Sequence, residues 1–124
     1  MNMCLLVAVG GAVGSVARYL MASTIQRSVG SAFPLGTVLV NILGCFLIGL
    51  LYVWLVARHD PREDLRGLLM VGVMGGFTTF SSFSLETVTL MMNGSYASAT
   101  MNVVVSLVAC LAGTWLGIAI ARIT

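Results

Sequence analysis

Four long apolar runs, joined by short polar stretches, take up almost the whole sequence. They extend from Met3 to Ile25, Phe33 to Ala57, Leu68 to Met92 and Tyr96 to Ile120. A helix needs about 20 mostly apolar residues to cross the hydrocarbon core of a bilayer. Lipid offers no partner to an unpaired backbone group, and the runs are too long for barrel strands. Each run is therefore predicted to be a transmembrane helix.

The composition leaves little material for a surface facing water. Of the 124 residues, 59% are hydrophobic and 8% are charged. An average soluble domain carries about 25% charged residues. We therefore expect an all-α membrane protein that forms a single four-span domain over residues 1–124, with no room for a soluble catalytic domain.

The few charged residues bear on partners and on topology. The formal net charge is +2, lysine is absent and the arginines form no basic stripe, so nucleic acid is not an expected partner. Four arginines lie on the side of the chain ends and the longest loop, namely Arg58, Arg62, Arg66 and Arg122. Arg27 lies on the opposite side. The positive-inside rule then favours cytoplasmic termini.

The sequence contains no recognisable catalytic or metal-ligating constellation. The single histidine, His59, falls in the polar loop after the second run. Neither a Ser-His-Asp nor a Cys-His arrangement is available, so no enzymatic activity is expected. Cys4, Cys45 and Cys110 all fall inside apolar runs without CxxC spacing, which indicates buried thiols and neither a disulfide frame nor a zinc site.

Small residues recur at the spacing that brings membrane helices into close contact. The pairs are Gly10 and Gly14, Gly72 and Gly76, and Gly113 and Gly117. This spacing predicts close packing between helices and carries no information about chemistry.

Two ionisable residues, Arg18 and Glu86, lie within the predicted spans. An ionisable side chain in a membrane is costly, which favours a functional role. The alternative is that both lie near the ends of spans and reach the interface by snorkelling. The sequence leaves both interpretations open.

The third run is the most informative, because it carries polar residues at mid-span. Gly75 and Gly76 are followed closely by Thr78 and Thr79, which together predict an interruption of the helix. Non-helical backbone at that depth is tolerated where protein or a water-filled cavity satisfies it. The N-terminus of a half-helix there favours anions, and free carbonyls favour cations.

Phe80 and Phe83 follow the expected interruption and share a helix face at i, i+3 spacing, close to the hydroxyls of Ser81, Ser82 and Ser84. Two phenylalanines at this spacing are most often packing residues. Their place beside an interruption and several hydroxyls favours a permeation path instead.

The fourth run carries a row of polar residues, one every four positions: Asn102, Ser106, Cys110 and Thr114. Such a row lies along one helix face and spans roughly 18 Å at 1.5 Å rise per residue. A single hydroxyl in a span usually bonds to its own helix, but packing alone does not explain a track of this length. Thr37 and Asn41 in the second run repeat the spacing, and the amide of Asn41 needs a partner or a cavity.

Three stretches in this order resemble the Fluc family of fluoride channels, also called the CrcB family. They are Gly10 to Tyr19, Gly36 to Gly44 and, as the most specific, Gly75 to Glu86. The resemblance covers nearly the whole chain. It implies a passive channel that lets fluoride leave a bacterial cytoplasm across the inner membrane. It also implies an antiparallel, dual-topology homodimer with two pores.

The resemblance implies roles for particular residues as well. Asn41 would line the pore, and Phe80 and Phe83 would present their ring edges, the positive part of the aromatic quadrupole, to the anion. The full set of expected pore residues is Asn41, Phe80, Ser81, Phe83, Ser106, Cys110 and Thr114. Asn102 stands where the family often has a tyrosine, and Cys110 where a hydroxyl is usual.

Two further sites follow from the resemblance. Arg18 would lie at an aqueous vestibule and attract anions by its field. The backbone carbonyls of Gly75 and Thr78 would hold a structural sodium ion at the dimer interface.

Two other function classes compete with a fluoride channel. The first is a small four-span proton-coupled multidrug exporter, but such chains carry an essential glutamate in the first span, where this sequence has none. The second is a membrane subunit or assembly factor that transports nothing, for which the polar row of the fourth run would have little use.

Overall fold

The computed structural model describes residues 2–58 and 61–124, and all regular structure in those residues is helical. Four segments are long and apolar enough to cross a membrane, which confirms the four predicted spans: Met3–Val29, Leu35–Ala57, Glu63–Met92 and Tyr96–Ile123. The expected boundaries differ by a few residues, most at the end of the first span and the start of the third. His59, placed by the sequence in the longest loop, lies outside the described residues.

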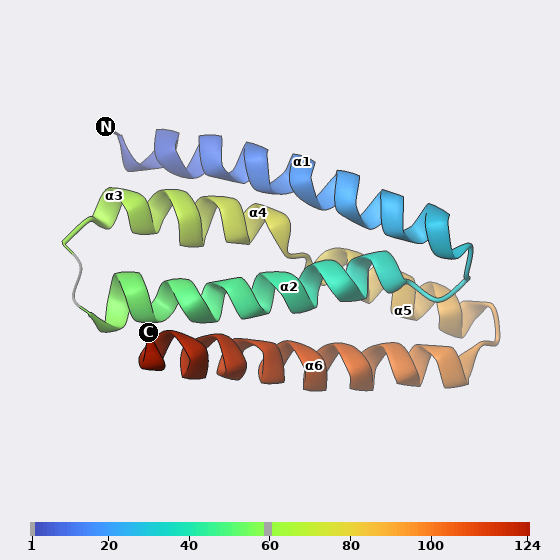
Figure 1. Cartoon of the computed structure of the whole chain (residues 1–124). Helices are drawn as coiled ribbons and strands as arrows, with labels where there is room; N and C mark the ends of the chain where they lie inside the picture. Colours follow the sequence, from blue (N-terminus) through green and yellow to red (C-terminus); the bar gives the residue numbers. More distant parts are fainter. Residues whose placement is uncertain (1, 59–60) are drawn as a thin grey trace.

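The elements follow one another as a helical bundle (Figure 1). In chain order they are α1 (Met3–Val29), α2 (Leu35–Tyr52), the π-helical segment η1 (Val53–Ala57), α3 (Glu63–Arg66), the π-helical segment η2 (Gly67–Met74), α4 (Gly75–Phe77), α5 (Phe80–Met92) and α6 (Tyr96–Ile123). Figure 1 shows α1 beside the first half of the third span and α2 beside α6, with the start of α1 and the end of α6 at the same end of the bundle.

The first span continues past its predicted end because the side chain of Gln26 organises the loop that follows. Its Nε2 donates to the carbonyl oxygens of Ser31 at 2.6 Å and Phe33 at 3.1 Å, and its Oε1 accepts from the backbone N–H of Gly36 at 3.2 Å. Gly30 ends α1 with a positive φ of 63°. Gln26, a polar residue near the end of α1, is therefore part of that helix and links it to the start of α2.

The glycine pairs lie where helices pack closely, as their spacing predicted. A Cβ at Gly10 would overlap the carbonyl oxygen of Leu68, and a Cβ at Gly72 would come within 2.9 Å of Gly10 Cα. Between α2 and α6, a Cβ at Gly117 would overlap the carbonyl oxygen of Phe46. Small residues let backbones meet where lipid supplies no hydrophobic force to press helices together.

Two residues with extended backbone, Thr78 and Thr79, separate α4 from α5 (Figure 1). Their φ and ψ angles are −86° and 156°, and −150° and 117°. The sequence predicted the interruption from Gly75 and Gly76 together with the two threonines, but both glycines are helical and only the threonines are extended. Gly76 serves close packing instead, because a Cβ there would overlap the carbonyl oxygen of Gly11 in α1.

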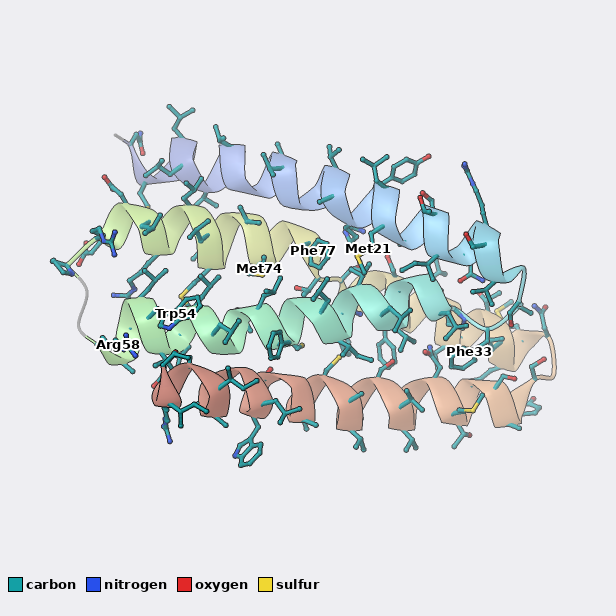
Figure 2. All side chains as sticks on the ribbon, viewed as in Figure 1. Met21, Phe33, Trp54, Arg58, Met74 and Phe77 are labelled. Carbon is teal, nitrogen blue, oxygen red and sulfur yellow. The ribbon has the colours of Figure 1, made fainter. Side chains whose placement is uncertain are left out.

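Few large apolar side chains are buried within the single chain, among the residues that the structure describes. Val40 of α2 is fully buried and packs with Met74 and Phe77, which point from the third span toward α2 (Figure 2). Many large apolar side chains lie on the outside, which suits a chain whose surroundings are hydrocarbon. At the end of the bundle, Arg58 Nη2 donates to the carbonyl oxygen of Ala121 at 3.2 Å (Figure 2).

Candidate functional site

The extended segment of the third span is held by one side chain of α2. Asn41 Nδ2 donates to the carbonyl oxygen of Thr79 at 2.9 Å, and Asn41 Oδ1 accepts from the backbone N–H of Thr79 at 2.7 Å. The Asn41 side-chain amide, which needs a hydrogen-bond partner in a membrane, therefore bonds to two backbone groups of Thr79. Because a side-chain amide has two N–H groups, one donor of Asn41 remains for another acceptor.

Thr79 also begins α5, where it acts as the N-cap. Its Oγ1 accepts from the backbone N–H of Ser82 at 3.1 Å and donates to Ser82 Oγ at 3.1 Å. The hydroxyl of Ser81 lies 3.2 Å from the same oxygen. Three hydroxyls thus gather at the N-terminus of a 13-residue helix, where the helix dipole is positive.

The carbonyl groups of Gly75 and Thr78 are among those that lose their helical donors at the interruption. In a continuous helix the N–H of Thr79 would donate to Gly75 and the N–H of Ser82 to Thr78. These N–H groups donate instead to Asn41 Oδ1 and Thr79 Oγ1. Oxygen atoms freed in this way suit a hard cation. Across residues 2–58 and 61–124, His, Cys, Asp and Glu form no group of three that could hold a metal.

A cavity of about 220 Å³ lies beside the extended segment. Its lining is Asn41, Cys45, Thr78, Thr79, Phe80, Phe83, Ser106, Leu107 and Cys110. Five of the expected pore residues therefore surround one space, namely Asn41, Phe80, Phe83, Ser106 and Cys110. Ser81 and Thr114 are not part of that lining, and Thr114 Oγ1 donates to the carbonyl oxygen of Cys110 at 3.2 Å.

The two phenylalanines of the cavity lie against each other at an angle. The centroids of the Phe80 and Phe83 rings are 5.3 Å apart, with 49° between the ring planes. Phe80 is 75% exposed in the single chain, whereas Phe83 is half-buried. A tilted pair of this kind presents positively polarised ring edges to its surroundings, which suits contact with an anion.

The polar row of α6 connects to α5 through a chain of hydrogen bonds. Ser106 Oγ donates to Asn102 Oδ1 at 3.4 Å, and Asn102 Nδ2 donates to Thr87 Oγ1 at 2.9 Å. Thr87 Oγ1 in turn donates to the carbonyl oxygen of Phe83 at 2.7 Å. Asn102 is 1% exposed, so it joins two helices in a buried position.

Arg18 and Glu86 meet at a second cavity of about 290 Å³, which Thr79 also lines. Arg18 Nε donates to the carbonyl oxygen of Gly76 at 3.0 Å, and Thr37 Oγ1 donates to Glu86 Oε1 at 2.6 Å. Glu86 Oε2 is buried without a hydrogen-bond partner among the described residues. Both ionisable groups thus make hydrogen bonds inside the protein, which argues against snorkelling as their only role.

Two residues of the site were not among the site residues predicted from the sequence. The first is Thr79, which organises the extended segment and lines both cavities. The second is Cys45, which lines the first cavity. Its signal was available, because Cys45 continues the four-residue spacing of Thr37 and Asn41 and so lies on the same face of α2.

Comparison with known proteins gives one consistent result. Residues 5–118 match the family described as "CrcB-like protein, Camphor Resistance (CrcB)". A protein of Geobacter sulfurreducens named "Fluoride-specific ion channel FluC" is 48% identical over 98% of both chains. Proteins with the same name from Magnetococcus marinus and Coxiella burnetii are each 44% identical, over 94% and 95% of this chain and 95% and 96% of their own lengths.

Proposed function

The chain belongs to the CrcB family, and we propose that it is a fluoride-selective channel through which fluoride leaves the cytoplasm passively. The observation that carries this proposal is the near full-length similarity to proteins named as fluoride-specific channels. Such a channel lowers the toxicity of fluoride to the cell. It is a multi-pass protein, and we place it in the inner membrane of a bacterium.

The first cavity supports this function through its chemistry. Its lining contains no carboxylate and supplies an amide, hydroxyls, thiols and aromatic edges. The N-terminus of α5 adds a positive helix dipole beside it. Fluoride is small and strongly hydrated, so a pore must replace its water by donors at close range. A narrow path lined by such donors selects fluoride over the larger chloride ion.

The residues of the path have separate roles. Asn41 uses one N–H to hold Thr79 and offers the other to the anion. Phe80 and Phe83 contribute ring edges, and Ser106 and Cys110 continue the path along α6. Ser81 supplies a hydroxyl at the start of α5, and Thr114 extends the track of α6. Arg18 attracts anions toward the second cavity.

A proton-coupled exporter fits these observations less well. An exporter of that kind needs an acidic side chain in the path of its cation. The first cavity has none, and Glu86 at the second cavity accepts a hydrogen bond from Thr37. The relatives' names point to an ion channel as well.

We further propose that two copies assemble antiparallel, with dual topology and two pores. Phe80 supports this assembly, because a large ring that lines the cavity is 75% exposed in the single chain. A second copy would cover it and narrow the open side of the path.

We also propose a structural sodium ion on the dimer axis, held by the carbonyl oxygens of Gly75 and Thr78 from each copy. The loss of their helical donors to Asn41 and Thr79 supports this assignment. Four carbonyl oxygens without a carboxylate suit a monovalent hard cation better than a transition metal. The ion would supply positive charge that compensates the converging carbonyl dipoles and would not be transported.

The test is fluoride efflux from liposomes that contain only this protein, with a potassium ionophore present to balance charge. Fluoride should leave rapidly and chloride far more slowly, while protein-free liposomes retain both. Equal rates for the two anions, or proton-coupled export of organic cations, would contradict the assignment.

A further inference from the structure

Two cysteines from different helices meet inside the first cavity. Cys45 of α2 and Cys110 of α6 both line it, so the two thiols share one space of about 220 Å³. A second observation agrees, because a Cβ at Gly113, one turn after Cys110, would lie 3.9 Å from Cys45 Cβ. The two cysteines therefore lie near each other at the contact between α2 and α6.

The helices that carry the two thiols are held at a fixed separation. A Cβ at Gly49 of α2 would overlap the carbonyl oxygen of Thr114 in α6, and a Cβ at Gly117 would overlap that of Phe46. Backbone therefore packs directly on backbone along this contact. Because the two helices are fixed relative to each other, the cysteine side chains lose little conformational entropy when an ion binds between them, which favours binding.

Both cysteines are free thiols, and their surroundings favour one class of ligand. Thiolate sulfur selects soft cations such as monovalent copper and silver or divalent mercury. A zinc site needs four ligands, and across the described residues no third His, Cys, Asp or Glu joins the pair. Two sulfur ligands, one from each helix, are the number that the linear, two-coordinate geometry of soft d¹⁰ cations requires.

We propose that Cys45 and Cys110 form a binding site for a soft, thiophilic cation, and that an ion bound there blocks the fluoride path. The blocking part rests on the proposed channel function. With mercuric ion, two S–H bonds break, two Hg–S bonds form and two protons pass to water, without any change in oxidation state. The product is neutral, which suits a site within a membrane, where a net charge is costly.

The position of the pair explains why the ion would block. Asn41, Phe80 and Phe83 share the same cavity of about 220 Å³, so a metal between the two sulfur atoms occupies space that an anion needs. A soft cation held by two thiolates has little affinity for fluoride, which is a hard ligand, and does not pass it along.

Cys4 provides the internal control, because it is exposed near the start of α1 and has no second cysteine beside it among the described residues. The experiments therefore use Cys4→Ser as the background, which should conduct and fold as the original chain does. Cys45→Ala, Cys45→Ser and Cys110→Ser are then added singly, together with the pair Cys45→Ala and Cys110→Ser.

The first measurement is the binding of mercuric ion to purified protein by equilibrium dialysis against a competing monothiol. The background variant should retain one ion per protomer. Each single-thiol variant should bind at least about a hundredfold more weakly, because a second tethered ligand raises avidity by about 10²–10⁴. If the single-thiol variants bound mercuric ion as tightly as the background variant, the two-sulfur site would be wrong. This result would not depend on whether the protein transports fluoride.

The second measurement is fluoride efflux from liposomes with and without mercuric ion, each variant being compared with its own metal-free rate. The background should lose most of its flux, and a dithiol chelator should restore it. The single-thiol variants should need at least about a hundredfold more metal. Absence of flux before metal is added would contradict the channel function, whereas metal-insensitive flux in the background would overturn the blocking site alone.

Discussion

Asn41 and Thr79 bind each other through two hydrogen bonds: the Asn41 amide donates to the Thr79 carbonyl at 2.9 Å and accepts from the Thr79 N–H at 2.7 Å. One side chain thus satisfies both backbone groups of a residue that has left the helix. Unpaired, these groups would each cost about 1–3 kcal/mol in a dry interior. The residue expected to contact the anion is therefore also the residue that shapes the site.

This double role makes Asn41→Asp a severe change. A carboxylate cannot donate to the Thr79 carbonyl, and it adds a negative charge to an anion path. Two like charges about 4 Å apart repel by about 4 kcal/mol at an effective dielectric constant of about 20, so fluoride efflux should fall by at least about a hundredfold. The control is Asn93→Asp at the exposed end of α5, which should conduct normally. Efflux from Asn41→Asp near the original rate would place the pore elsewhere.

Replacement of the cavity phenylalanines should have a smaller effect. Phe80→Ile or Phe83→Ile keeps apolar bulk but removes a polarised ring edge, a contact worth roughly 0.5–1.5 kcal/mol. Efflux should therefore slow by about threefold to tenfold in each variant. Phe33→Ile is the matched control, because Phe33 lies in the loop before α2, at the opposite end of that span from Arg58 (Figure 2). If both cavity variants and the control conducted alike, ring edges would have no part in fluoride passage.

Asn102→Ala should weaken the fold. The change removes the bonds to Thr87 and Ser106 at a position that is 1% exposed. Hydrogen bonds between membrane helices are worth about 0.6–2 kcal/mol, so unfolding in denaturing detergent, followed by helical circular dichroism, should need correspondingly less denaturant. Ser84→Ala, at an exposed site on α5, should unfold like the original chain. An unchanged midpoint for Asn102→Ala would show that the bonds to Thr87 and Ser106 contribute little.

Gly10 and Gly11 provide a matched pair for helix packing. A Cβ at Gly10 would overlap the Leu68 carbonyl, whereas a Cβ at Gly11 would meet only the Gly72 carbonyl at 4.0 Å. Gly10→Ala should therefore lower stability by about 1–3 kcal/mol, the usual cost of overpacking, while Gly11→Ala should have little effect. The same detergent titration compares them. Similar losses in both would indicate that α1 shifts freely against the third span.

Removal of sodium from the solutions tests the proposed sodium site at the carbonyls of Gly75 and Thr78. After exhaustive exchange of sodium for a large organic cation, fluoride flux and the dimer fraction should both fall, and sodium added back should restore them. The reason is that converging carbonyl dipoles repel one another once the compensating charge is gone. Flux and dimer content that survive prolonged exchange would show that these carbonyls need another partner.

The sequence predicted the spans well because hydrocarbon imposes a simple requirement on length and polarity. The predicted ends of the spans were less accurate where a polar side chain forms hydrogen bonds with a nearby loop. The sequence predicted the end of the first span before Gln26, but Gln26 is helical and its side chain bonds to the loop that follows. Its hydrogen bonds depend on where the loop returns, which hydropathy does not reveal.

The interruption of the third span shows a different limit of the sequence. Gly75 and Gly76 can adopt non-helical conformations, but this conformational freedom does not by itself end a helix. The residues that do leave, Thr78 and Thr79, do so where Asn41 and the Thr79 hydroxyl supply replacement hydrogen bonds. The position of a break thus depends on a partner 38 residues away in the chain.

Thr79 lines the cavity of Arg18 and Glu86 as well as that of Asn41, so one residue borders both cavities. Its N–H, carbonyl and hydroxyl all make hydrogen bonds, and none of these groups is free to turn. The backbone that borders both cavities is therefore held in place and does not act as a hinge. On the proposed fluoride path, any movement that admits the ion at Thr79 must therefore come from the surrounding side chains, because the Thr79 backbone is fixed.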